Sequence, residues 1–461
     1  MSTDPRRARA AQMARPDEAV FDLRASVPST MSSPLAHPLI WPMPRPIGPI
    51  ASAARHLGLA ALHAGWARAE ARLALELPDG TVHHLGGHGP DRGGDVDAAP
   101  RVIVRDDRTF LRVLMRGELG AGEAYVAGDW DTPDLVAVVR AFLRATAARG
   151  VESRLTRLAS LPALWRHRRA ANSRTGAARN IHAHYDLGNS FYDLFLDAPT
   201  MMYSCALWPR DGAGQHEAVS ADALTRGQAA KLERLCVRLD LGPRDHLLEI
   251  GSGWGGMAIH AARTRGCRVT TVTISRQQHE RAQARIAAAG LSDRVTVLLR
   301  DYRDLGAAGR FDKLVSIEMI EAVGYEFLPT YFEVCARALR PGGRMALQAI
   351  TMPDDRFDAY RRQVDWMQTY IFPGSLIPSL AALRAASASA GLRWHGAEDI
   401  GPDYAPTLRA WREVFEARRD EVRALGFDEP FIRTWRMYLA FSEAAFAERT
   451  LGDHQIVLTR G

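Results

Sequence analysis

The sequence predicts an α/β protein in which a doubly wound sheet, with helices on both faces, follows a smaller α+β domain. From residue 228 onward, short apolar runs alternate with stretches of helical spacing, as in parallel strands joined by crossover helices. Earlier in the chain, the turn signal Pro78-Asp79-Gly80 separates two segments with strand character, which is typical of a β-hairpin. The 461 residues leave room for two or three folded units, since domains usually run to about 100–200 residues.

The chain divides into four segments. Residues 1–50 are rich in proline, which breaks helices and strands, so we expect a disordered tail. Residues 51–150 form the small amino-terminal α+β domain. Residues 151–179 form a basic amphipathic linker, and residues 180–461 form the large α/β domain.

Individual elements follow from local patterns. In the small domain, strands at 71–77 and 81–85 form the hairpin, and the polar run at 106–109 resembles the capped start of a helix. In the large domain, helices are expected at 277–289 and 328–339. The expected strands are 246–250, 268–274, 295–299, 313–317, 344–350 and, at the chain end, 453–460.

The linker has the composition of a segment that contacts a membrane. Leucine and tryptophan recur through residues 155–165, and seven arginines lie between residues 154 and 179. A cationic amphipathic stretch of this kind can lie at an anionic lipid surface. The same composition fits a solvated helix between domains, so both interpretations stay open.

Composition restricts the class of protein. Lys and Arg number 59 against 53 Asp and Glu, and this excess of +6 favours an anionic partner only weakly. The four cysteines lie far apart without a CxxC pair, which argues against a zinc site or disulfides and suits a reducing cytosol. No apolar run approaches the roughly 20 residues that a spanning helix needs, and no secretory signal follows the first arginines. We therefore expect a cytoplasmic protein without a metal site.

A glycine-rich turn marks the cofactor site. Residues 247–256 read LLEIGSGWGG, a strand that runs into a turn where glycines let the backbone approach a ligand closely. A dinucleotide-binding fold would place an acid for the ribose about 20 residues later. Here residues 272–275 read VTIS instead, and Asp301-Tyr302 follows the third strand. This layout is typical of a class I methyltransferase with a Rossmann-like sheet, and it predicts S-adenosylmethionine as the ligand.

Several further motifs resemble those of the cyclopropane-fatty-acyl-phospholipid synthase family, over nearly everything after the tail. The most specific are HYDLGN at 184–189 and YSCALW at 203–208, and residues 117–131 resemble the family's amino-terminal signature. The segment SIEMIEAVG at 316–324 is similar to the branch that includes the carboxy-terminal domains of plant cyclopropane synthases. The set is completed by YIFPG at 370–374 and by Asp403-Tyr404.

The resemblance assigns a cofactor site to named positions. It implies that S-adenosylmethionine is the methyl donor and that Asp301 and Tyr302 flank its adenine. The other residues expected to hold this cofactor are Tyr203, Ser204, Gly251, Gly253, Thr273, Ile274 and Gln278.

The resemblance also implies a general base. The family uses a bound bicarbonate ion, held by a Cys, a Glu, a His, an Ile main chain and a Tyr. The matching positions, our candidate catalytic residues, are Cys205, Glu321, Gln348, Ile350 and Tyr404. Gln348 stands where the family has His. It can donate and accept hydrogen bonds but cannot carry a proton in the working pH range.

The implied reaction places a methylene across the cis double bond of an unsaturated phospholipid acyl chain and makes a cyclopropane. Methyl transfer to an alkene leaves a carbocation, so water must be excluded and a base must remove a proton from the new methyl group. The expected partners are a membrane phospholipid and an anionic membrane surface, reached peripherally from the cytoplasmic face. A homodimer is considered, and nucleic acid is not expected as a partner.

Four alternatives remain. The same carbocation can end as a methyl-branched or methylene-bearing chain. A nucleic-acid methyltransferase often carries an Asn/Asp-Pro-Pro-Tyr/Phe turn after the fourth strand, where residues 318–321 here read EMIE. A lipid-binding module without catalysis would not need Glu321, Cys205 and Tyr404. Cys205 as a nucleophile lacks an activating His in its motif, and it can instead have a packing role only.

Overall fold

A computed structural model of the chain describes residues 48–87, 99–147, 187–307 and 311–461. The predictions for the proline-rich tail up to residue 47 and for the basic linker at 151–179 lie outside the described residues. The start of the HYDLGN motif, up to residue 186, lies outside them as well. The three predicted boundaries between the four segments stay predictions.

The described residues of the amino-terminal part form a four-stranded sheet and three helices. The strands are β1 (Arg72–Glu76), β2 (Val82–Gly86), β3 (Arg101–Val104) and β4 (Trp130–Asp131), in the order β2-β1-β3-β4. The helices are α1 (Gly48–Trp66), α2 (Arg108–Val126) and α3 (Leu135–Ala147). The predicted hairpin is confirmed, since β1 and β2 pair antiparallel around a turn in which Gly80 has φ +84°. That left-handed conformation explains the glycine at the turn.

Helix α2 begins where the polar run at 106–109 predicts it. The Asp106 side chain accepts the backbone N–H of Arg108 at 2.9 Å and so binds one of the free amide groups of the first turn. The helix is interrupted at Gly117, which has φ 56° and ψ −127°. Beyond the interruption, Gly122 lies against the ring of Trp366.

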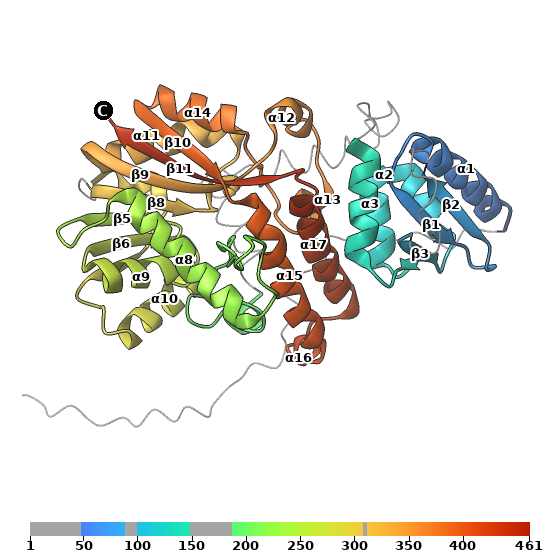
Figure 1. Cartoon of the computed structure of the whole chain (residues 1–461), viewed down its shortest axis with the longest axis horizontal. Coiled ribbons are helices and arrows are strands. Elements are labelled where there is room, and N and C mark those ends of the chain that lie inside the picture. The colour runs from blue at the N-terminus through green and yellow to red at the C-terminus, as the bar shows by residue number, and fades with distance from the viewer. Residues whose placement is uncertain (1–47, 88–98, 148–186, 308–310) are drawn as a thin grey trace, which may run out of the picture. The chain divides into compact units, whose positions relative to one another are not determined.

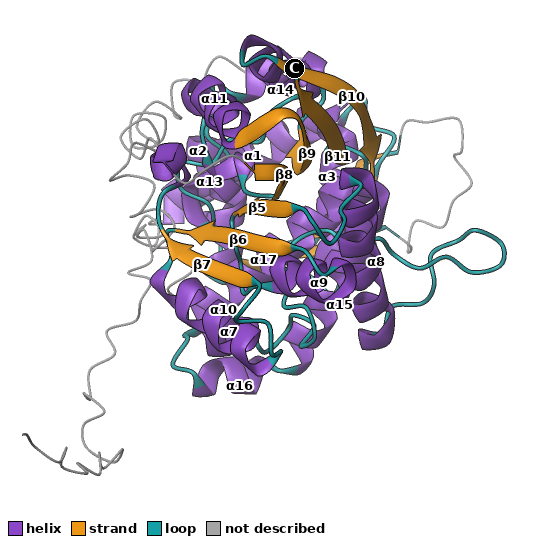
Figure 2. Ribbon diagram, turned by 90° about the vertical axis from the view of Figure 1, so that its left-hand side faces the viewer, coloured by secondary structure: helices purple, strands orange, loops and turns teal. Residues whose placement is uncertain are grey.

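A seven-stranded sheet forms the large domain, in the order β10-β11-β9-β8-β5-β6-β7 (Figures 1 and 2). Its strands are β5 (His246–Ile250), β6 (Arg268–Thr273), β7 (Val295–Leu299), β8 (Phe311–Ile317), β9 (Leu339–Thr351), β10 (Leu392–Asp399) and β11 (Gly452–Arg460). Strands β5 to β9 pair parallel, whereas β11 runs antiparallel to both β9 and β10. All six predicted strands are present.

Strand β10 has no counterpart among the predicted strands. It is an edge strand in which only Leu392 is fully buried, so its sequence lacks the apolar run by which the other strands are recognised.

Successive side chains along a strand point to opposite faces of the sheet. The neighbours Leu247 and Leu248 on β5 therefore belong to separate hydrophobic cores, one on each face.

Helices cover both faces of this sheet, as the doubly wound prediction requires. On one face lie α8 (Ala221–Leu239), α9 (Gly256–Arg265) and α10 (Arg276–Ala288), and on the other lie α11 (Leu328–Ala338) and α14 (Leu380–Ser389) (Figure 2). The helices at 277–289 and 328–339 are confirmed. Shorter helices are α7 (Asn189–Tyr192), α12 (Asp354–Tyr360), α13 (Trp366–Tyr370) and α16 (Arg419–Ala424), and short 3₁₀ turns are η2 (Tyr302–Ala307), η3 (Ile320–Ala322) and η4 (Tyr325–Phe327).

Two long helices connect the large sheet to the amino-terminal elements. Helices α15 (Gly401–Ala417) and α17 (Glu429–Ala447) pack against each other, and α17 also packs against α2 and α3 (Figure 1). Arg433 on α17 donates to the carbonyl oxygens of Tyr125 and Trp130, at 2.6 and 2.9 Å. None of the helices in the described part of the chain combines the length and the apolar character that crossing a bilayer requires.

Candidate active site

The glycine-rich turn lies where β5 ends and α9 begins. Gly251 has φ +94° and Gly253 has φ +47°, which are backbone conformations that side chains with a Cβ rarely adopt. A Cβ built on Gly253 meets no atom within 4 Å, so this residue borders open space. The turn thus offers backbone and room to a ligand, and it fits S-adenosylmethionine.

The second and third turns of the predicted cofactor site lie at the same edge, because β5, β6 and β7 are adjacent and parallel. The Thr273 hydroxyl donates to Gln278 Oε1 at 2.9 Å, and both side chains are buried. Ile274, between β6 and α10, is half-buried. The Asp301 carboxylate pairs with the guanidinium of Arg303 at 2.6 Å, which fixes its orientation.

Tyr302 and the Tyr203-Ser204 pair are each fixed by neighbours. The ring of Tyr302 packs edge-on against Tyr331. The hydroxyl groups of Tyr203 and Tyr438 are 2.7 Å apart. The Ser204 hydroxyl accepts from Lys231 Nζ at 2.5 Å, so an ammonium buried in α8 holds the loop after residue 203.

A carboxylate that the sequence interpretation left without a role lies at the centre of the predicted catalytic residues. Glu318 Oε1 accepts the backbone N–H of Cys205 at 2.8 Å and Gln348 Nε2 at 2.7 Å. Glu318 Oε2 accepts the Tyr404 hydroxyl at 2.7 Å. Three of the five predicted anion ligands therefore donate to one side chain of the protein itself.

The sheet explains why these groups meet. Glu318 directly follows β8, and Ile317 is the register partner of Gln348 on β9. The Glu318 backbone N–H donates to the Gln348 carbonyl oxygen at 2.8 Å, which extends that strand pairing by one residue. Tyr404 arrives from the first turn of α15.

The other two predicted ligands, Glu321 and Ile350, pair with each other. The Ile350 backbone N–H donates to Glu321 Oε1 at 2.6 Å. Burial, followed by the nearby Glu318 carboxylate, raises the pKa of Glu321 to about 8. Glu321 is therefore mostly protonated at neutral pH.

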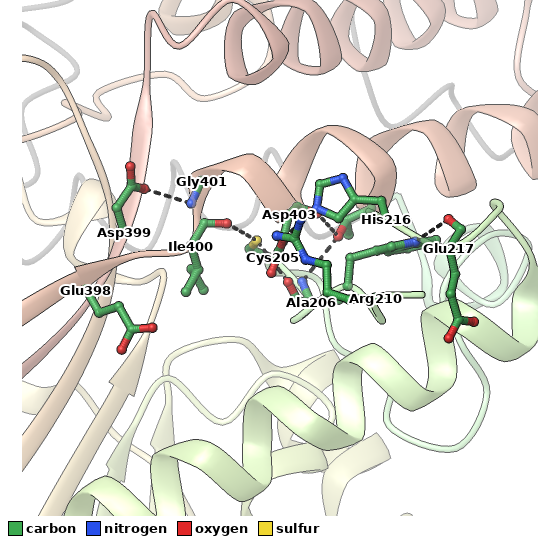
Figure 3. Close-up of polar contacts among 12 residues, drawn as sticks. Cys205, Ala206, Arg210, His216, Glu217, Glu398, Asp399, Ile400, Gly401 and Asp403 are labelled. Atoms are coloured by element: carbon green, nitrogen blue, oxygen red, sulfur yellow. Dashed lines mark hydrogen bonds and ion pairs between the residues drawn. The ribbon is translucent and has the colours of Figure 1, made fainter. Parts of the chain in front are cut away.

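The Cys205 thiol binds backbone carbonyl oxygens. Its Sγ donates to the carbonyl oxygens of Ala206 and Ile400, at 3.2 and 3.6 Å (Figure 3). Burial raises the pKa of this thiol well above its ordinary value, with the neighbouring carboxyl groups adding to the effect. A thiol that keeps its proton is a poor nucleophile, so the packing interpretation is favoured over the nucleophilic one.

The loop that carries Cys205 is fastened to the start of α15. Arg210 and His216 both bind the Asp403 carboxylate, at 2.6 and 2.7 Å (Figure 3). Asp403 is the neighbour of Tyr404, so this ion-pair group positions the tyrosine that donates to Glu318.

Two more ionisable residues near Glu318 were not predicted. Asp453 Oδ2 accepts from Gln348 Nε2 at 3.0 Å, and burial, followed by Glu318, raises the pKa of Asp453 well above its usual range. Burial also lowers the pKa of Lys231. Asp453 was recognised only as a strand residue, and no sequence signal separates it from other strand residues.

Glu318 could have been found from its position. In open α/β sheets ligands bind at the carboxyl ends of the strands, and Glu318 directly follows the strand beside the glycine-rich one. An acidic residue at this position is a candidate catalytic residue. The residues named here as the Glu318 cluster are Cys205, Glu318, Gln348, Tyr404 and Asp453.

A free bicarbonate does not fit between these residues. The donors that the family resemblance assigns to it, from Cys205, Gln348 and Tyr404, all bind Glu318. A second anion would have to displace the carboxylate or stand beside it without these donors. Among the described residues, no group of His, Cys, Asp and Glu forms a metal site.

Comparisons with known proteins agree on the kind of protein. The family described as mycolic acid cyclopropane synthetase matches residues 172–456. The tuberculostearic acid methyltransferase UfaA1 of Mycobacterium tuberculosis is 40% identical over 425 residues, which cover 92% of this chain and 95% of that protein. The cyclopropane-fatty-acyl-phospholipid synthase of Escherichia coli K12 is 35% identical over 405 residues, covering 84% and 96%.

Solved structures show the same likeness. The cyclopropane synthase MmaA2 from Mycobacterium tuberculosis gives a TM-score of 0.55 at 26% identity, over 61% of this chain and 98% of that chain. The mycolic acid cyclopropane synthase CmaA1, complexed with SAH and CTAB, gives 0.54 at 27% identity with the same coverage.

Proposed function

The chain belongs to the mycolic acid cyclopropane synthetase family of S-adenosylmethionine-dependent methyltransferases, and on this premise we propose that it forms a cyclopropane on an unsaturated phospholipid acyl chain. The observation that carries the proposal is the Glu318 cluster beside the cofactor turn, in which Glu318 is half-buried and the other four residues are buried. The side chain of Met319, the residue after Glu318, lies against Gly251. A base next to a methyl donor is what alkene methylation followed by proton removal needs.

The residues of the site would divide this work. S-adenosylmethionine, when bound, supplies an electrophilic sulfonium methyl group. Gly251 and Gly253 give it backbone and space, while Thr273, Gln278 and Asp301 would bind its polar groups. The buried aromatic side chains around Tyr203 exclude water, which protects a cationic acyl chain from becoming an alcohol.

A second product deserves a direct test because the two relatives differ in their names. The Escherichia coli protein is called a cyclopropane synthase, whereas the 40% identical protein is called a tuberculostearic acid methyltransferase. The same cation can instead lose a proton from the methyl-bearing carbon, which gives a methyl-branched alkene. Alternatively, a hydride can shift from that carbon to the cationic carbon, and loss of a methyl proton then gives a methylene-bearing chain. The second candidate function is therefore a fatty acyl methyltransferase that makes branched chains.

Mass spectrometry and ozone treatment together separate these outcomes. The purified protein is incubated with S-adenosylmethionine and vesicles of a cis-monounsaturated phosphatidylglycerol. We expect the acyl chain to gain one CH₂ and to resist ozone, which cleaves alkenes but not the ring. A CH₂ gain that ozone still cleaves supports the branched candidate, and methylation of nucleic acid but not lipid contradicts both.

We also infer that the protein works at an anionic membrane surface from the cytoplasmic side. The support is the arginine-rich sequence at 151–179. Replacing Arg166, Arg168 and Arg169 together by Gln is expected to weaken binding to phosphatidylglycerol vesicles at low salt and to leave cofactor affinity unchanged. Vesicle sedimentation measures the change, and unaltered binding of the triple variant would favour a solvated interdomain helix.

A further inference from the structure

The carboxylate of Glu318 is surrounded by hydrogen-bond donors. Its two oxygens accept one backbone N–H, one amide N–H and one phenol O–H, at 2.7–2.8 Å. Bonds of this kind to an ionised carboxylate are stronger than those between neutral groups. On the basis of the proposed alkene methylation, we infer that Glu318 itself is the general base, and that it replaces the free bicarbonate ion expected of the family.

Two further carboxyl groups and one ammonium group lie near Glu318. Burial raises the pKa of Glu321 to about 8 and the pKa of Asp453 well above its ordinary value, with the Glu318 carboxylate adding to both effects. The ammonium of Lys231 lies close enough to attract both Glu318 and Asp453. Three hydrogen-bond donors and a nearby ammonium group thus surround the Glu318 carboxylate.

Gln348, the residue that departs from the family, fits a resident carboxylate. Its Nε2 donates to Glu318 Oε1 at 2.7 Å, and its Oε1 accepts from Gln455 Nε2 at 3.1 Å. An amide presents a donor at a fixed position and never competes for the proton. A base that belongs to the protein needs only this donor.

The backbone at Glu318 is held in a conformation that side chains seldom adopt. Its φ is +46°, in the left-handed region. Strain of this kind persists where the surroundings enforce it, and it is concentrated at functional sites. Here it turns the chain directly after β8 so that the carboxylate meets Cys205, Gln348 and Tyr404.

The step that Glu318 would perform balances without another reactant. After methyl transfer, one former alkene carbon carries the new methyl group and the other carries the positive charge. Glu318 takes a proton from that methyl group, and the electron pair of the broken C–H bond forms the C–C bond that closes the ring. Glu318 is then a neutral acid, and it returns its proton to water after the product leaves.

A binding experiment tests the anion position without any lipid. Wild-type protein and Glu318→Gly are titrated with ¹³C-labelled bicarbonate, and line broadening is followed by NMR. Glycine suits φ +46°, so the variant is expected to fold, and loss of the carboxylate frees three donors for a small anion. We expect bicarbonate to bind Glu318→Gly and not the wild type. Binding to the wild type that Tyr404→Phe abolishes would overturn the inference.

A turnover experiment tests the chemistry. In buffer freed of carbon dioxide, the wild type is expected to keep its rate. Glu318→Gln is expected to lose about 10²- to 10⁴-fold in product formation, the usual contribution of a general base, while its affinity for S-adenosylmethionine is unchanged. Added bicarbonate should restore part of the activity of Glu318→Gly but none to Glu318→Gln, whose amide still fills the site.

The matched control is Glu333→Gln, which alters an exposed acid on α11 and should leave the rate unchanged. A wild type that slows without carbon dioxide and recovers with bicarbonate would contradict the inference, and so would a fully active Glu318→Gln. If the wild type modifies no lipid at all, the proposed function fails. The binding experiment then still decides whether Glu318 or a free anion occupies the position.

Discussion

Replacing Glu321 by glutamine is expected to stabilise the protein strongly at pH 8 and only slightly at pH 5. Burial, followed by Glu318, raises the pKa of Glu321 from 4.5 to about 8 in the folded state. The unfolded chain loses this proton near pH 4.5, so between the two values the folded state binds more protons than the unfolded state. Stability from this group is complete below pH 4.5 and is lost as the pH rises toward 8.

The size of this stability difference follows from the separation between the pKa values of Glu321 in the unfolded and the folded state. One pKa unit corresponds to about 1.4 kcal/mol, so between pH 5 and pH 8 the wild type loses about 3–4 kcal/mol that the variant does not lose. Glutamine is a close match for the protonated acid. Its amide oxygen can still accept the Ile350 N–H, and its NH₂ group replaces the protonated Oε2, for which the described residues offer no hydrogen-bond partner.

Urea denaturation at both pH values measures the effect. All other ionisable groups titrate in both proteins, so the difference between the two stability curves isolates Glu321. Glu333→Gln, at an exposed position of α11, is the control and should follow the wild type at both pH values. A Glu321→Gln advantage of equal size at pH 5 and pH 8 would refute the reasoning, because it would mean that Glu321 does not titrate with a raised pKa.

Three further outcomes are expected. S-adenosylmethionine at a hundredfold excess over its dissociation constant should stabilise the wild type by about 2.7 kcal/mol, and Gly253→Val should abolish this thermal shift because its side chain enters the open space of the turn. Gly122→Ala should cost about 1–3 kcal/mol, since its Cβ would lie 2.5 Å from Trp366 Cδ1, whereas Gly396→Ala, which meets no atom within 4 Å, should cost much less. Iodoacetamide at pH 7.5 should leave the folded protein unmodified, as counted by mass spectrometry, because all four cysteines are buried; rapid labelling of Cys205 would revive its role as a nucleophile.

The fold could be predicted largely because central parallel strands such as β5 are buried on both faces. Such strands read as apolar runs, and β5 and β7 have the predicted bounds. Only Leu392 is fully buried in the edge strand β10, so its sequence carries no such run. Strand β3 was missed as well, since its four residues are too few to show a pattern.

Residues of the site could be predicted only where they belong to a recognisable sequence motif. The glycine-rich turn and Tyr404 belong to recognisable motifs, whereas Asp453 and Lys231 come from β11 and α8, far away in the chain. Their proximity to Glu318 depends on strand order and register, which local sequence does not reveal. Glu318 lies within the motif at 316–324, but the resemblance to the family assigns a catalytic role to Glu321 and none to Glu318.

When the base is a side chain of the protein, its position depends on the pairing of the β-strands around it. Gln348 on β9 faces Ile317 on β8 and Gln455 on β11, so the position of the Glu318 carboxylate is set by the register of three strands. A free ion can adjust its position to each substrate, but a side chain held by three donors cannot. Which proton is removed, and hence ring or branch, must then depend on how the acyl chain is placed against Glu318. Product choice in this protein should therefore respond to substitutions that line the acyl chain, while substitutions in the Glu318 cluster should lower the rate of both products alike.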